Sequence, residues 1–107
     1  MNRLFAPILL ALVLVVVGSN VGEAQQVVTA DGKQFSTTEM RISYQDTVVF
    51  MNYDAVPHQV FSSSNGLRFN LKRLLPGSGG AVRFAKRGVA EVRCAIHRDM
   101  RMKIIVE

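Results

Sequence analysis

The sequence predicts an all-β domain over residues 25–107, an antiparallel sandwich or barrel of six to eight short strands. Three observations indicate this fold class. No stretch after residue 24 has the apolar spacing of a helix of useful length. Short runs rich in Val, Ile, Phe and Thr recur, and several alternate apolar with polar residues. Turn-forming residues separate these runs at short intervals, as is typical of sandwiches and barrels.

The first half of the domain holds strands separated by short turns. Residues 27–35, VVTADGKQF, begin as a strand and then reach an Asp-Gly turn. Residues 40–54, MRISYQDTVVFMNYD, contain two strand pieces with a Gln-Asp turn between them. Residues 58–69, HQVFSSSNGLRF, begin with a strand that leads into a loop rich in Ser and Gly.

The second half begins with a strong turn at residues 74–80, LLPGSGG. Residues 81–94, AVRFAKRGVAEVRC, are interpreted as a hairpin whose turn is Lys-Arg-Gly. Its second strand places three side chains on one face: Ala90, Val92 and Cys94. The last strand lies within residues 101–107, and its shared face carries Met102, Ile104 and Val106.

Residues 1–24 have the three parts of a secretory signal peptide. Arg3 supplies a positive charge, residues 7–18 are an apolar run, and Gly22 and Ala24 place small residues before a cleavage site. The apolar run falls well short of the about 20 residues that a membrane span needs, which argues against an uncleaved anchor. We expect cleavage after Ala24 and an exported domain of residues 25–107. The expected location is the periplasm, with no stable membrane span after cleavage.

The net charge of +5 favours some partners over others. Removal of the leader takes away one basic and one acidic residue, so the mature chain stays basic. An exported chain without an aromatic-interleaved basic motif is not expected to bind nucleic acid. A basic surface fits either simple solubility or docking to an acidic protein partner.

A single cysteine, Cys94, stands in the stretch CAIHRDMRM, and an internal disulfide needs two. His97, Met100 and Met102 follow it closely, and His58 begins an earlier strand after a proline. Methionine is a poor zinc ligand, and calcium and magnesium prefer oxygen. Copper accepts thiolate, imidazole and thioether, so this set of donors indicates a copper site.

A catalytic or purely structural role explains these cysteine, histidine and methionine residues less well than a copper site does. A catalytic cysteine would normally be activated by a helix N-terminus or a close base, and the sequence shows no helix. A simply buried Cys94 would fit among inward-facing strand positions. His58 taken alone is better explained as a core or surface histidine, and a methionine near a strand is usually core packing. The interpretation as ligands depends on all of them occurring together.

These residues resemble the cupredoxins, the plastocyanin-like family of small blue-copper proteins. Residues 46–60, DTVVFMNYDAVPHQV, look like the strand and loop that carry the family's first histidine ligand. Residues 74–97 are similar to its Pro-Gly turn, hairpin and Cys-x-x-His, and KIIVE fits its closing strand. The resemblance covers about Val27 to Glu107. It implies a Greek-key β-sandwich of about seven to eight strands and one type 1 copper ion, Cu(I) or Cu(II).

The resemblance also implies the ligands. His58 and His97 would supply imidazoles and Cys94 the thiolate. Met100 would give the short loop of amicyanin-like proteins, and Met102 the longer loop of plastocyanin. Met102 as axial ligand would leave almost no final strand. We therefore expect Met100 to be the axial ligand and Met102 to lie in the core.

Four positions depart from the family pattern. Ile96 and Arg98 stand where many relatives have proline beside the second histidine. Gln59 stands where an asparagine commonly ties the two ligand loops together, and Ala95 stands where Ser, Thr or Asn often follows the cysteine. Support around the sulfur is therefore expected to differ. Arg98 adds a positive charge beside the second histidine. We expect it to assist docking to an anionic partner and to favour Cu(I).

The resemblance implies a non-enzymatic carrier that shuttles single electrons between exported redox proteins. Its partners would be a cytochrome or a redox enzyme with an acidic docking surface, and the carrier itself would be a monomer. The alternative function is a copper chaperone or storage protein without a blue state. A dinuclear copper site would need two cysteines, and a copper oxidase or nitrite reductase would need additional domains.

Overall fold

The computed structural model describes residues 24–107 and places nine strands there. Within this range there is no helix long and apolar enough to cross a membrane. The predicted leader falls outside the described residues except for Ala24, so its cleavage stays a prediction. The strands are β1 (Gln25–Asp31), β2 (Gln34–Phe35), β3 (Glu39–Ile42), β4 (Thr47–Asn52), β5 (His58–Ser62), β6 (Phe69–Leu74), β7 (Gly79–Arg83), β8 (Gly88–Cys94) and β9 (Arg101–Val106).

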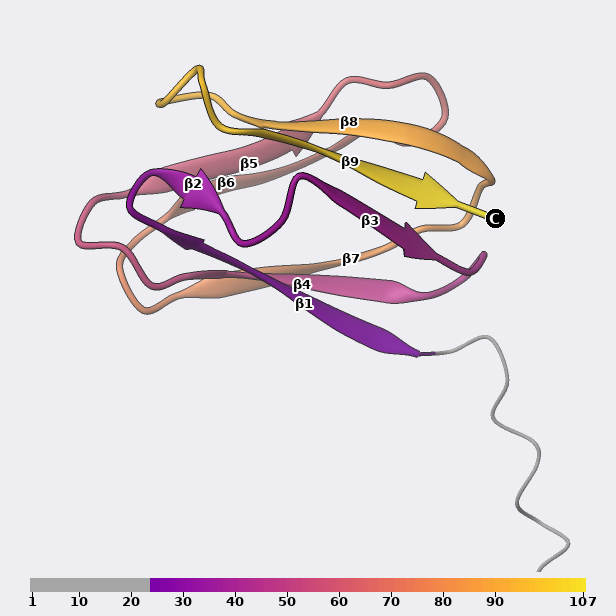
Figure 1. Cartoon of the computed structure of the whole chain (residues 1–107), viewed down its shortest axis with the longest axis horizontal. Coiled ribbons are helices and arrows are strands. Elements are labelled where there is room, and N and C mark those ends of the chain that lie inside the picture. Colours follow the sequence, from indigo (N-terminus) through magenta and orange to yellow (C-terminus); the bar gives the residue numbers. More distant parts are fainter. Residues whose placement is uncertain (1–23) are drawn as a thin grey trace, which may run out of the picture.

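The strands form two sheets that pack face to face (Figure 1). One sheet has the order β2-β1-β4-β7, and the other has the order β3-β9-β8-β5-β6. The chain crosses between the sheets repeatedly, so that β3 and β4 follow each other in sequence but lie in different layers. The predicted all-β sandwich is confirmed. Its nine strands are one more than the upper limit of the six to eight predicted.

Two strand pairings differ from the antiparallel arrangement predicted from the sequence. β1 runs parallel to β4, and β3 runs parallel to β9. Parallel partners cannot be joined by a tight hairpin and need a longer connection. Here each connection passes through strands of the other sheet, which the local sequence does not reveal.

The predicted hairpin over residues 81–94 is wrong, because β7 and β8 lie in different sheets. β7 pairs with β4, and the chain beyond it stays near the start of β4 through Phe84. Phe84 donates its N–H to the carbonyl of Asp46 (3.0 Å), and its own carbonyl accepts the N–H of Gln45 (2.8 Å). The buried Phe84 ring packs edge-to-face against Phe69 between the sheets. Alternation of apolar residues therefore identifies both strands but not their partners.

β6 is a strand that the sequence pattern did not predict. Its burial pattern lacks a clean alternation of inside and outside positions. Lys72 has a positive φ of 63°, and the pairing with β5 shifts register between Gln59 and Phe61. Such an irregularity interrupts the period of two by which strands are found in a sequence.

The core lies between the two sheets and follows the alternation of the longer strands. β4, β8 and β9 bury every second side chain. Met102 lies opposite Val92 in the β8–β9 pair, and both belong to the main hydrophobic core. This placement matches the prediction that Met102 is a core residue.

Three loops meet at one end of the sandwich, on the left in Figure 1. They are residues 53–57 between β4 and β5, residues 75–78 between β6 and β7, and residues 95–100 between β8 and β9. His58 and Cys94 lie where two of these loops join their strands. All the predicted ligands are therefore at this end.

Alternation along β8 predicts unequal effects of two valine truncations. Val92 is fully buried, whereas 47% of the Val89 surface is exposed. Val92→Ala should lower the free energy of unfolding by about 2 kcal/mol, through lost burial and a residual cavity. Val89→Ala should cost less than about 1 kcal/mol. Urea unfolding of both variants measures the difference, and equal costs would contradict the assigned faces of β8.

Candidate metal centre

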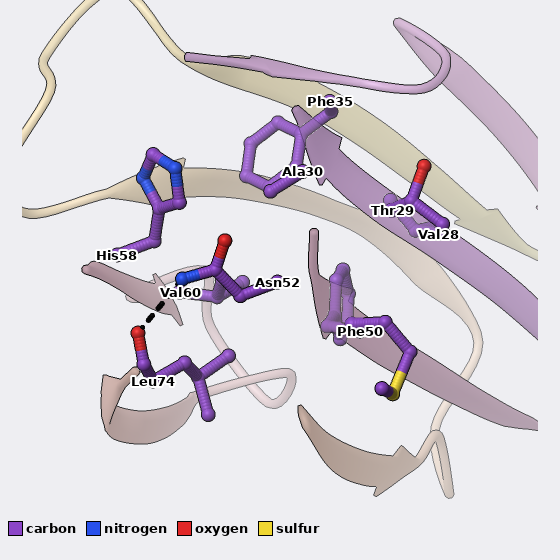
Figure 2. Close-up of a pocket in the computed structure, with 10 residues that line it drawn as sticks. Val28, Thr29, Ala30, Phe35, Phe50, Asn52, His58, Val60 and Leu74 are labelled. Atoms are coloured by element: carbon purple, nitrogen blue, oxygen red, sulfur yellow. Dashed lines mark hydrogen bonds between the residues drawn. The ribbon is translucent and has the colours of Figure 1, made fainter. Parts of the chain in front are cut away.

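His58 begins β5 directly after Pro57 and is completely buried. Figure 2 shows its ring at one end of the space between the sheets, near Asn52 and across from Phe35. The apolar lining beside His58 leaves no room for a water molecule. The core therefore holds the inner side of this histidine in place.

Cys94 ends β8, and the next six residues form a tight loop back to β9. Met100 closes this loop: its N–H donates to the carbonyl of His97 (3.0 Å), and its carbonyl accepts the N–H of Cys94 (3.3 Å). The Cys94 thiol is buried, whereas His97 is partly exposed. The short loop thus places one donor inside the protein and one at its surface.

The structure brings His58, Cys94 and His97 together. The Cys94 Sγ lies 3.6 Å from Nδ1 of His58 and 3.9 Å from Nδ1 of His97. The two Nδ1 atoms are 3.1 Å apart, and all three donor atoms lie within 4.8 Å of one another. Two imidazole nitrogens and one sulfur converging on one point fit a small thiophilic cation.

The protonation of His58 supports its role as a donor. Its Nε2 lies 3.0 Å from a carboxylate oxygen of Asp54, which can only accept a hydrogen bond when ionised. Nε2 must therefore carry the hydrogen in neutral His58, and the lone pair is then on Nδ1. That lone pair points toward Cys94 and His97, as a metal ligand requires.

The two methionines lie in different surroundings. Met100 is buried in a small cluster with Ala30 and Cys94, separate from the main core. Met102 is buried in the main core. Met100 is thus the methionine that shares a cluster with Cys94. Met100 as the additional ligand stays a prediction.

Asp54 was not predicted from the sequence to be part of the site. A backbone hydrogen bond from Lys33 (2.8 Å) and the contact with His58 lower the pKa of Asp54 to about 2. Asp54 is therefore ionised at neutral pH, close to the buried histidine. The only sequence signal was an acidic residue four positions before a candidate ligand, which is common by chance.

Asn52 was not predicted either, and it joins two of the loops around the site. Its buried side-chain amide donates to the carbonyls of Val56 and Leu74, both at 2.9 Å. Figure 2 marks the bond to Leu74. Its side-chain oxygen accepts the N–H of Asp54 (2.8 Å). Asn52 thereby fixes the turn that aims Asp54 at His58.

Gln59 and Ala95 connect the two ligand segments through their backbones. The N–H of Gln59 points at Cys94 Sγ (3.4 Å), and its carbonyl accepts the N–H of Ala95 (2.9 Å). The Gln59 side chain instead donates to Asn70 on β6 (3.1 Å). The expectation of different support around the sulfur stays a prediction. Arg98 is exposed in the same loop as His97.

Comparisons with known proteins identify a copper-binding fold. The model of the family "Copper binding proteins, plastocyanin/azurin family" matches residues 23–107. A reduced tryptophan-to-tyrosine variant of amicyanin is 26% identical, covering 81% of this chain and 84% of its own, with a TM-score of 0.71. A purple cupredoxin from Nitrosopumilus maritimus is 26% identical, covering 79% of this chain and 100% of its own, with a TM-score of 0.67.

An enzyme also shares the fold. A copper-containing nitrite reductase from Thermus scotoductus is 23% identical, with a TM-score of 0.72. The match covers 78% of this chain but only 22% of the reductase chain, and at this identity it shows the fold alone. No curated protein sequence matches the chain.

The contact between Asp54 and His58 predicts a specific effect of Asp54→Asn. The amide can still accept the Nε2 hydrogen, but the negative charge that favours Cu(II) over Cu(I) is lost. We expect Cu(II) affinity to fall about tenfold and the reduction potential to rise. Competition titration and voltammetry measure both quantities.

Glu91→Gln is the matched control for Asp54→Asn, because it removes an exposed carboxylate on the outer side of β8. It should leave the reduction potential nearly unchanged. Equal shifts in both variants would mean that net charge, and not the contact with His58, sets the potential.

Proposed function

Because the chain belongs to the plastocyanin/azurin family of copper-binding proteins, we propose that it carries single electrons between exported redox proteins. One copper ion is its cofactor. We propose His58, Cys94, His97 and Met100 as the ligands. The observation that carries the first three assignments is the convergence of the two Nδ1 atoms and the Cys94 sulfur within 4.8 Å. Met100 is added because it is buried in one cluster with Cys94.

The residues around the site support the carrier role by holding the donors still. Asp54 fixes the tautomer of His58, and the core packs against the inner side of that ring. The Gln59 N–H points at the Cys94 sulfur, where it would stabilise thiolate charge. Copper would supply the one-electron couple. Donors that move little would keep the rearrangement energy low when the copper changes between Cu(I) and Cu(II).

Burial favours a carrier over a chaperone or storage protein, the second candidate function. Of the four proposed ligands only His97 is partly exposed. Among the methionines in the described part of the chain, Met100 and Met102 are buried, and Met40 and Met51 are partly exposed but are not among the proposed ligands. A protein that hands copper to a partner needs sulfur donors that the partner can reach, and here Cys94 and Met100 are both covered.

The remaining expectations belong to the same proposal. An exported location, with the periplasm as the compartment, agrees with an unpaired cysteine that has a metal as its partner. The carrier would work as a monomer without catalysing a reaction of its own. It would not bind nucleic acid, and its donor and acceptor would be redox proteins with an acidic docking surface.

Addition of Cu(II) to the purified metal-free protein tests the proposal. We expect an intense visible absorption band at one copper per chain that disappears on reduction, because a Cys94 thiolate bound to Cu(II) gives strong charge transfer. Cys94→Ser should abolish the band. A colourless wild-type complex would contradict the carrier function and leave the chaperone or storage function.

The two methionines give a separate prediction. Met100→Leu should keep the colour and raise the reduction potential, because the thioether donor to Cu(II) is lost. Met102→Leu replaces a core side chain by one of similar volume, so it should cost less than about 1.5 kcal/mol of stability. Its spectrum and potential should stay near wild type. A larger spectral change for Met102→Leu than for Met100→Leu would reverse the assignment.

A further inference from the structure

A groove of about 460 Å³ lies on the outer side of the sandwich beside the metal centre. It is lined by Phe61, three arginines, and the ligand residue Cys94 with its neighbour Ala95. We call it the arginine groove after Arg93, Arg98 and Arg101. The Cys94 side chain points inward and is buried, so the groove passes behind the sulfur ligand.

The register of the sheet places the groove residues in a row. Phe61 on β5 lies opposite Arg93 on β8, and Arg93 lies opposite Arg101 on β9. All three side chains point away from the core. Arg98 joins them from the loop between β8 and β9. The row therefore lies one residue from Cys94.

No arginine of this row belongs to an ion pair in the described part of the chain. Directly opposed like charges on neighbouring strands destabilise a sheet. Between residues 24 and 107 the one ion pair between fully charged groups joins Arg41 to Glu107, and it includes no arginine of the groove. An external anion would offset the repulsion between Arg93 and Arg101.

The lining favours carboxylates on a protein surface over a small ion. Guanidinium groups bind carboxylates in a bidentate manner, and three of them in an open groove can receive several carboxylates at once. Phe61 adds the apolar contact that is typical of protein interfaces. Such charge complementarity accelerates encounter between partners and is screened by salt.

We propose that the arginine groove is the docking site for an acidic surface of a redox protein partner. The partner class rests on the proposed electron-carrier function. The groove would hold the partner behind Cys94, at a place separate from the partly exposed His97. Arg98 is one of three contributors to it, and the row formed by Arg93 and Arg101 is its centre.

Amide shifts of the ¹⁵N-labelled, Cu(I)-loaded protein, titrated with octaglutamate at low and high salt, test this proposal. We expect shifts at Phe61, Arg93, Ala95 and Arg101 that disappear at high salt. The double variant Arg93→Gln/Arg101→Gln should bind octaglutamate about tenfold more weakly. The matched control Arg68→Gln/Lys86→Gln removes two exposed charges outside the groove and should change binding less than about twofold.

Three results would overturn the proposal. Equal weakening in both double variants would show attraction by net charge without a defined site. Equivalent shifts with inorganic phosphate would mark a small-anion site, and stronger binding to phosphatidylglycerol vesicles would mark a membrane surface. Because the titration uses the Cu(I) form, its outcome does not depend on whether the Cu(II) form is blue or transfers electrons.

Discussion

The antiparallel pairing of β5 with β8 is the constraint on which the metal centre depends. Val60 lies opposite Cys94, so that Cys94 and His58 point inward from adjacent strands although 36 residues separate them in sequence. A shift of this register by one residue would turn Cys94 to the outer face. Core packing around Val60, Val92 and Met102 holds the register and therefore the distance between the first two donors.

Hydrogen-bonded polar groups hold the loops at the end of the sandwich where the metal centre lies. Asn52 bonds two carbonyls and one N–H from the surrounding loops, and Asp54 takes the hydrogen of His58. Burying such groups without partners would cost about 1–3 kcal/mol each. Because the polar groups of Asn52 and Asp54 are paired, His58 can stay buried with its Nδ1 lone pair directed at the site.

The two faces of the same strands carry different groups. Alternation along β8 sends Cys94 inward to the metal centre and Arg93 outward to the arginine groove. The ligand loop adds His97 and Arg98 at the surface between them. The proposed carrier function needs a covered ion and a surface for partners, and a period of two along one strand places the candidates for both on adjacent residues.

The sequence alone determined the fold class, the inward-facing residues of the longer strands and the candidates for the metal centre. Alternation and turn residues are local signals, and four donors of restrictive chemistry stood out in a chain with one cysteine and two histidines. It also predicted that Met102 lies in the core, because using Met102 as a ligand would have left almost no final strand. The tertiary structure alone decided that β7 pairs with β4, that two strand pairs are parallel, and that Asp54, Asn52 and the outward row of arginines surround the site. These features arise from contacts between residues far apart in the chain, and neither periodicity nor spacing in a single sequence records which strands become neighbours.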